Sequence, residues 1–592
     1  MPEGIGLPVL DSSPESPSAP ASSPGRRRAW VFLLVHLAIA FHIAWWWRFG
    51  RAVSPLEPSE AMELSKHGVV NAGAVFFLLA ILSTFLFGRF FCGWACHMLA
   101  LQDFCGWILR RLGLRPRPLR SRVLLWVPAA AFVYMFVWPL IYRLWIGDGL
   151  LEVRRVELMT EDFWATFPAW PVALVTFAVC GFAVVYFLGN KGFCAYACPY
   201  GAAFSVADRW SPLRIRVSDA CTGCAQCTAV CTSNVTVHRE VADYGAVVSS
   251  GCMKCLDCVA SCPTGALGLG WGKPAALLTR SRSKGKSAPT ASSPSFRDEL
   301  ILSVAFVFAF FTLRGLYGRV PFLLALGASA ILASLVLTTW RWATGRRTGF
   351  PGISLGRFGR RGRWTRVDRG FAVVVGLGAV LWLHSAWIRG HEWRADAAWA
   401  DGDWSTFDRH AEVATEHGLL PRPDLQLRLA GSALQQGDLD VWDLRLLAAA
   451  EAGASEAAVL RVRAQGFEMR GETGPAVETY ERLIAATPLS EGAYIRLARL
   501  WHRAGDPVAA SRVLERGLAA RGRTASARLL YLAGTAAAQC GDLTASEARL
   551  RRALQRDPEF MPARRGLERL TGAPGGLPER VAPTPSSGAE GP

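Results

Sequence analysis

Eight cysteines near the middle of the chain recur in two copies of the pattern C-x2-C-x2-C-x3-C, at intervals that suit metal ligation. Three thiolates on one tight loop can ligate three irons of a cubane, and the fourth cysteine then reaches the neighbouring cubane. The spacing therefore predicts two [4Fe–4S] clusters with exchanged fourth ligands, in a reducing compartment. The first cluster takes Cys221, Cys224, Cys227 and Cys262, and the second takes Cys252, Cys255, Cys258 and Cys231.

Zinc is the competing interpretation of these cysteines, because zinc sites also use cysteine pairs two residues apart. Zinc leaves the third and fourth cysteine of each copy unexplained. The stretch from Cys252 to Gly265 resembles bacterial two-cluster ferredoxins. The chain departs from them at Thr232, where proline is usual, and the 20 residues between Cys231 and Cys252 leave room for an inserted hairpin.

Two further cysteine pairs each follow an apolar run: Cys92 with Cys96, and Cys194 with Cys198. Residues four apart share one helical face, so these four thiols, called the cysteine quartet below, could meet at the membrane face. They could ligate a further iron–sulfur centre, bind copper or zinc, or cycle between dithiol and disulfide. They could also be small buried residues at helix ends. His97 is an additional candidate donor, since histidine is a common metal ligand.

Apolar runs of about 20 residues predict the helices that position these cysteines in a bilayer. The first run follows Arg26 to Arg28 and lacks a small-residue cleavage site, so we expect an uncleaved span rather than a signal peptide. Seven spans are predicted, at residues 29–47, 68–88, 123–142, 170–189, 299–316, 320–340 and 370–388.

Charge in the loops predicts the orientation of these spans. Residues 110–122 carry six Arg and no acid, 272–298 carry six Lys or Arg, and 341–369 carry nine Arg. We therefore expect the N-terminus and the clusters in the cytoplasm, and the residues after 389 in the periplasm of a bacterial cell with an inner membrane. A different number of crossings between 299 and 340 would reverse the last assignment. The net charge is +18, and the basic residues lie between apolar runs rather than on one soluble domain. We therefore expect no nucleic-acid partner.

The C-terminal third is repetitive. Gly-Asp or Gly-Glu dipeptides begin at Gly402, Gly437, Gly471, Gly505 and Gly541, at intervals of 35, 34, 34 and 36 residues. A period near 34 between helical stretches is the signature of tetratricopeptide repeats. This resemblance predicts a stacked array of helix pairs that docks a protein partner. A helical bundle without repeats is the alternative.

The expected fold is mainly α: about seven membrane helices, an inserted α+β two-cluster ferredoxin-like domain, and a C-terminal α-solenoid of tetratricopeptide-like repeats. The expected domains are a disordered N-terminus (1–28), a four-helix membrane core (29–205), the ferredoxin-like domain (206–271), a basic linker (272–298), a transmembrane hairpin (299–341), a basic cytoplasmic loop (342–369), a seventh span (370–389), the repeats (390–573) and a disordered tail (574–592).

The combination of FCGWAC after the second span, FCAYACPYG after the fourth and a two-cluster ferredoxin behind them resembles the polyferredoxin-type membrane proteins, which include NapH, NosR and CcoG. The resemblance covers residues 29–271 and implies electron transfer between a membrane or cytoplasmic donor and a periplasmic or metal-linked acceptor. His97 replaces the proline expected after Cys96, whereas Pro199 keeps it. Only about 28 residues precede the first span, so the flavin-binding domain of NosR, and its flavin, are not expected. The repeats are an addition to the family pattern.

Three functions remain open. The first is an electron relay from a quinol or cytoplasmic donor to a membrane or periplasmic acceptor. The second is a CcoG-like assembly factor that reduces or transfers copper for a respiratory metalloenzyme, and the third is a redox-sensing scaffold. No Walker loop, dinucleotide fingerprint, haem-attachment motif or catalytic triad is apparent in the sequence. We therefore expect an electron-transfer subunit or accessory reductase rather than a self-contained enzyme.

Overall fold

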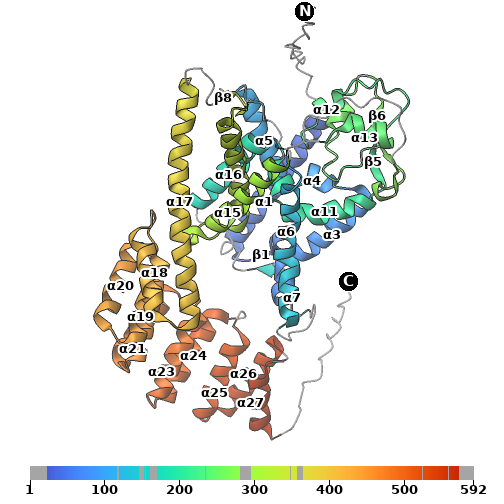
Figure 1. The fold of residues 1–592 in the computed structure, drawn as a ribbon. Helices are drawn as coiled ribbons and strands as arrows, with labels where there is room; N and C mark the ends of the chain where they lie inside the picture. Colours follow the sequence, from blue (N-terminus) through green and yellow to red (C-terminus); the bar gives the residue numbers. More distant parts are fainter. Residues whose placement is uncertain are drawn as a thin grey trace, which may run out of the picture. The chain divides into compact units, whose positions relative to one another are not determined.

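The computed structural model describes residues 23–116, 119, 121–145, 153, 155–160, 170–233, 235–279, 295–346, 348–355, 365–522, 525–557 and 559–572. The predicted tail 574–592 and much of the predicted linker lie outside these residues. The chain divides into two compact units, Met1–Ala386 and Trp387–Pro592, both drawn in Figure 1. The long helix α17 contributes to both units, which are described separately.

Five helices in the described part of the chain are long and apolar enough to cross a membrane. They are α1 (Ser23–Phe49); the run from η2 (Leu124–Trp126) through α6 (Val127–Phe132) and the π-helical η3 (Val133–Val137) to α7 (Trp138–Trp145); the run from α8 (Trp170–Phe177) through the π-helical η5 (Ala178–Ala183) to α9 (Val184–Leu188); α16 (Phe322–Ala343); and α17 (Arg366–Asp401).

The other two predicted spans are also helices. Helix α3 (Ala72–Phe87) is apolar but has 16 residues, and α15 (Phe296–Leu313) carries Asp298 and Glu299 in its first turn. Helices α15 and α16 pack against each other. The chain is therefore a membrane protein with several apolar helices, and its exact number of crossings stays a prediction.

The two segments that carry the quartet are built alike. In each, an apolar helix ends at a glycine with positive φ, 66° at Gly88 and 100° at Gly189, a conformation that glycine adopts without a Cβ penalty. A short helix and a longer helix follow: α4 (Phe90–Trp94) and α5 (His97–Arg111) in one copy, and α10 (Gly192–Tyr196) and α11 (Pro199–Trp210) in the other. Helix α11 packs on α3 of the first copy, whereas α5 packs on α9 and η5 of the second copy. Each copy therefore covers the other.

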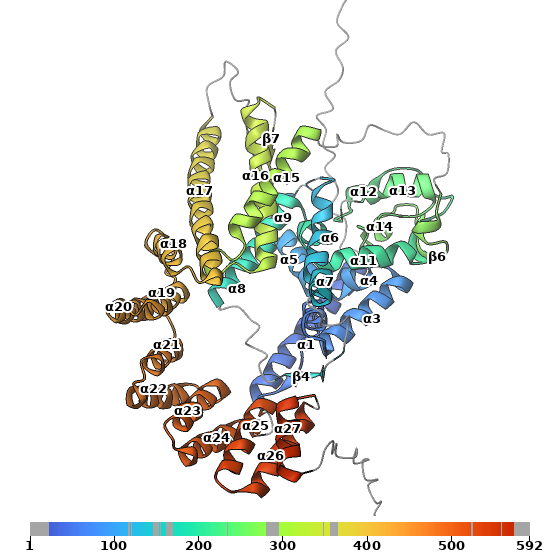
Figure 2. The same ribbon diagram turned by 60° about the horizontal axis from the view of Figure 1, so that its bottom comes forward.

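The predicted ferredoxin-like segment is enclosed by two antiparallel strands, β5 (Leu213–Val217) and β6 (Leu267–Trp271), with Leu213 opposite Trp271 and Val217 opposite Leu267. Short helices α12 (Gln226–Ala229) and α14 (Asp257–Ala260) follow the two cysteine loops. Figure 2 shows these helices gathered beside β6, and α14 also contacts α1.

The 20 residues between Cys231 and Cys252 do not form the hairpin for which they leave room. This stretch instead forms helix α13 (Val237–Tyr244). Val237 and Val241 lie one turn apart and are both buried, so the stretch has an apolar face that suits a helix against the domain core. Gly245, with φ of 68°, then ends the helix. A single bridge between Arg216 and Ala246 attaches the following residues to β5.

The remaining short elements of the first unit are β1 (Ala52–Val53) paired with β4 (Met159–Thr160), β2 (Val69–Asn71) paired with β3 (Arg155–Glu157), β7 (Thr348–Phe350) paired with β8 (Ile353–Leu355), η1 (Pro58–Ala61), α2 (Met62–His67), η6 (Ala275–Leu277) and η7 (Leu316–Gly318).

The second unit is tetratricopeptide-like. Its helices pack in consecutive antiparallel pairs, and each repeated glycine has φ between 73° and 83°, where it ends one helix. The acidic residue that follows starts the next helix. The helices are α18 (Trp404–Glu416), α19 (Pro423–Gln436), α20 (Leu439–Glu451), α21 (Glu456–Met469), α22 (Thr473–Ala486), α23 (Glu491–Arg503), α24 (Pro507–Arg521), α25 (Ala527–Gln539), α26 (Leu543–Arg556) and α27 (Met561–Thr571).

The acidic caps of the repeats yield a stability prediction. The carboxylate of Asp506 accepts a hydrogen bond from Ala509 N at 2.8 Å, whereas Glu472, at the same place in its repeat, makes no side-chain cap. Asp506→Ala should lower the free energy of opening of α24 by about 1 kcal/mol, measured by amide hydrogen exchange. Glu472→Ala is the matched control and should have a much smaller effect on α22. Equal effects would contradict the capping role.

Candidate iron–sulfur and membrane thiol sites

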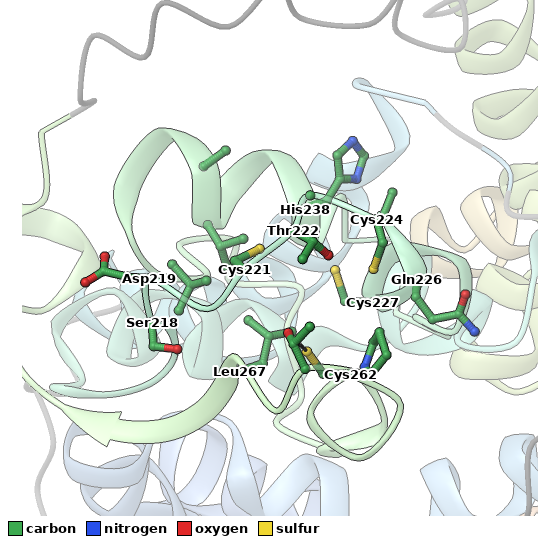
Figure 3. A pocket seen from close by; sticks show the side chains of 17 residues that line it. Ser218, Asp219, Cys221, Thr222, Cys224, Gln226, Cys227, His238, Cys262 and Leu267 are labelled. Atoms are coloured by element: carbon green, nitrogen blue, oxygen red, sulfur yellow. Dashed lines mark hydrogen bonds between the residues drawn. The ribbon is translucent and has the colours of Figure 1, made fainter.

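The cysteines predicted to ligate the first cluster surround one cavity. Cys221, Cys224, Cys227 and Cys262, called the outer site below, line a cavity of about 360 Å³ together with Asp219 and His238, as Figure 3 shows. Cys221 and Cys224 are exposed, so this cavity opens to solvent. The structure thus brings the exchanged ligand Cys262 next to the first loop. Four thiols around one cavity match the donor set of a [4Fe–4S] cluster.

The cysteines predicted to ligate the second cluster also lie together, deeper in the protein. This inner site consists of Cys231, Cys252, Cys255 and Cys258. The thiol of Cys258 lies close to Cys252, Cys255 and Cys231, and also to Cys227 of the outer site. Cys255 and Cys258 are buried, and burial is the main cause that raises the pKa of Cys252 to about 11. The inner site is therefore shielded from solvent, whereas the outer site is not.

The two cysteine loops share a strained backbone. Ala225 and Leu256 have φ of 59° and 64° immediately before α12 and α14. Two residues before Ala225, Gly223 has φ of 71° in the cysteine loop of the outer site, called the outer loop. The matching residue in the cysteine loop of the inner site, called the inner loop, is Lys254, with φ of 50°. A side chain in this region costs about 1–2 kcal/mol per residue. The inner loop therefore keeps a lysine where glycine would be less strained.

The lysine is explained by a buried ionic network centred on Asp208. Asp208 is fully buried, pairs with Lys254 Nζ and lies 3.2 Å from Arg214 Nη2. Its Oδ1 also accepts a hydrogen bond from Arg89 N at 3.0 Å. These contacts join α11, β5, the inner loop and the turn after α3. A buried carboxylate with two cationic partners is well compensated, so Asp208 positions the inner loop against the membrane helices.

The four thiols of the quartet converge. The thiol of Cys96 lies close to those of Cys194, Cys92 and Cys198. Burial is the main cause that raises the pKa of Cys194 to about 11 and that of Cys198 to about 12. Free thiols with such values are protonated at neutral pH. A bound metal cation would favour the thiolate forms of Cys194 and Cys198.

Gln102 is a site residue that sequence reasoning missed. Its side chain is fully buried. Nε2 donates to Cys194 Sγ at 3.1 Å, and Oε1 accepts from Phe193 N at 3.1 Å. The amide thus orients a cysteine of the other copy. The only available signal was its position less than two turns after Cys96, which does not distinguish a contact from a solvated polar residue.

His97 does not join the quartet. Its Nε2 lies 4.0 Å from Glu57 Oε1, and its side chain is 38% exposed. Within the described residues, no three His, Cys, Asp or Glu side chains are placed to hold a single metal ion as they stand. A cubane separates its four ligands more widely than one ion does, because its body contains four irons and four sulfides. The role of His97 as a donor stays a prediction.

The inner loop lies directly against the first cysteine pair. Trp94 Nε1 donates to Lys254 O at 3.0 Å. A Cβ added at Gly93 would lie 1.9 Å from Met253 O, so only glycine allows this approach. Met253 is itself buried in the same apolar cluster as Cys92. The predicted second-cluster loop and the membrane quartet are therefore immediate neighbours.

Two family models match this part of the chain. A 4Fe–4S binding domain matches residues 71–115 and 170–218, and a 4Fe–4S dicluster domain matches residues 213–263. Residues 71–263 carry ferredoxin-type 4Fe–4S domains. The first model includes the quartet, and the second includes the outer and inner sites.

Curated relatives agree with this assignment. The methylamine utilization ferredoxin-type protein MauN of Methylorubrum extorquens is 28% identical over 187 residues, 30% of this chain and 61% of that protein. The ferredoxin-type protein NapH of Haemophilus influenzae is 26% identical over 206 residues, 33% of this chain and 65% of that protein. The chain thus spans less than two thirds of the length of these relatives.

The helical repeats have solved neighbours. A tetratricopeptide repeat protein from Parabacteroides merdae aligns with 31% of this chain and 72% of its own length, at 17% identity and a TM-score of 0.26.

Proposed function

We propose that the chain relays electrons between a quinol or cytoplasmic donor and a membrane or periplasmic acceptor. The observation that carries this proposal is the direct packing of the inner loop on the quartet, through Trp94, Gly93 and Met253. When bound, [4Fe–4S] groups supply one-electron redox chemistry. The chain's own contribution is to hold three thiol-lined sites in contact, from the exposed outer site to the buried quartet.

Each site has residues suited to its place in such a relay. The exposed Cys221 and Cys224 leave the outer site open to a soluble or membrane-surface donor. Burial of Cys255 and Cys258 at the inner site and of Cys92 in the quartet limits the access of water, and Gln102 orients Cys194. The basic loops favour a cytoplasmic position for the outer and inner sites. The repeats are proposed to dock a protein partner, on the periplasmic side if seven spans cross the membrane.

Metal analysis tests this proposal. Anaerobically purified protein should contain about eight irons and matching labile sulfide for two cubanes, with cubane signals by EPR after reduction. Iron reproducibly above this amount would assign a further iron–sulfur centre to the quartet. Protein with a full complement of zinc and no labile sulfide would refute the relay.

The second candidate is handling of copper for a metalloenzyme. The donor type of the quartet favours it, because soft sulfur donors select Cu(I); its four thiols would have to draw together to hold a single ion. In this case the inner site would supply one electron for each Cu(II) reduced to Cu(I). Copper in near-equal amount to protein, lost when the quartet is changed to serine, would favour this function over the relay.

A further inference from the structure

Two buried cations occupy matching positions in the two copies of the cysteine motif. Arg89 stands three residues before Cys92, and Lys191 stands three residues before Cys194. Each follows the glycine that ends the preceding membrane helix, directly at Gly88 or one residue later at Gly189. Arg89 is 5% exposed and Lys191 is 1% exposed. Matching position and matching burial indicate one shared task.

The partners of these cations are neutral. Lys191 Nζ donates to Ser233 Oγ at 3.0 Å. Arg89 Nη1 donates to Ser250 O at 2.9 Å and to Ser205 Oγ at 3.3 Å. In the described part of the chain, no carboxylate lies within ion-pair distance of either cationic group.

The nearby carboxylates already compensate other cations. Asp208 pairs with Lys254 and Arg214, and Arg28 pairs with Asp103 and with Asp257, the latter at 3.1 Å. An isolated buried cation costs several kcal/mol, so a buried anion must compensate it.

Thiols lie close to both cations, and Lys191 also lies near Asp103, which is already paired with Arg28. Lys191 faces Cys255 and Cys231 of the inner site. Arg89 faces Cys92, Cys194 and Cys198 of the quartet. Gly201 also leaves room for the guanidinium, since a Cβ there would lie 3.3 Å from Arg89 Nη2. A neutral dithiol or a disulfide carries no charge that could compensate Arg89, whereas metal-bound thiolates do.

We propose that Lys191 and Arg89 are duplicated counter-ions of two anionic thiolate–metal centres, Lys191 for the inner site and Arg89 for the quartet. This inference rests on the proposed function. Reduction adds one negative charge to the centre. Burial disfavours this added charge, and a nearby cation favours it. Lys191 therefore raises the reduction potential of the inner site, and Arg89 strengthens metal retention at the quartet. The outer site has no Lys or Arg among its lining residues and depends on solvent instead.

Potentiometric titration followed by EPR tests the role of Lys191. Lys191→Met should lower the reduction potential of the inner site by at least about 59 mV, which is a tenfold change in the equilibrium for one-electron reduction. The reduction potential of the outer site should stay unchanged. Cys221→Ser identifies the outer signal. Lys191→Arg should keep the potential, and so should Lys273→Met, which removes an exposed lysine two residues after β6. Lys191→Gln, which removes the charge but can still bond Ser233, serves if the methionine variant does not fold.

Metal content tests the role of Arg89. After dialysis against a chelator, Arg89→Met should retain at least about tenfold less metal at the quartet than the wild-type protein, and Arg89→Lys should retain most of it. Wild-type protein without metal at the quartet would overturn the proposal for Arg89. An unchanged inner potential in both neutral Lys191 variants would overturn the proposal for Lys191. Protein that lacks all iron and sulfide would instead refute the relay itself.

Discussion

Changing Cys92 and Cys194 together to serine should lower the rate of electron transfer from the reduced protein to a membrane acceptor by at least about a hundredfold. The quartet is the site in contact with the inner loop, with Cys92 in the same apolar cluster as Met253, and loss of residues that merely orient metal ligands already costs 10- to 100-fold. Both [4Fe–4S] signals should persist, because neither residue belongs to the outer or inner site. Stopped-flow oxidation of the dithionite-reduced protein in lipid nanodiscs measures this rate.

The chain offers a matched control for this change. Cys105 and Cys180 are also buried in the membrane part, but they lie outside the quartet. Cys105→Ala and Cys180→Ala should leave the rate within a few-fold of wild type. If the double serine variant transfers electrons at the wild-type rate, the quartet is not on the electron path.

The second large effect concerns Asp208. Asp208→Ala leaves the buried side chains of Lys254 and Arg214 without their carboxylate, and removal of one partner from a buried ion pair costs about 3–5 kcal/mol. We expect the inner loop to detach from α11 and the turn after α3, with loss of the inner iron–sulfur signal. Thermal stability of the purified protein and its iron content are the measurements.

An exposed pair provides the comparison for Asp208. Asp396 lies 2.7 Å from Arg428, and both side chains are at least 30% exposed. Asp396→Ala should cost less than about 1 kcal/mol, because exposed ion pairs contribute little. If Asp208→Ala lowered the free energy of unfolding by a similarly small amount, the buried network would not position the inner loop.

Local patterns predicted the features that depend on neighbours in sequence. Cysteine spacing predicted which thiols group together, since each loop places three of its thiols by itself. The glycine period predicted the helix pairs of the second unit, where the repeated glycines with positive φ and the acidic caps act within one turn. Apolar runs predicted the membrane helices, but the run before Cys92 yielded a helix of 16 residues.

The failures involve residues whose role depends on distant partners. The segment between Cys231 and Cys252 forms α13 because Val237 and Val241 find a core against which to pack. In the sequence Gln102 is an ordinary polar residue of α5, and its role follows only from the packing of α10, which places Cys194 next to its amide.

The sequence by itself determined the cysteine sets, the apolar helices and the helical repeats, because spacing along the chain is enough to specify each of them. Only the tertiary structure decided that the inner loop packs on the quartet, and that Asp208 compensates Lys254 and Arg214 while Arg89 and Lys191 face thiols. These are contacts between residues up to 161 positions apart, such as Arg89 with Ser250. Burial makes an uncompensated charge costly, and burial is a property of the packed molecule rather than of any segment.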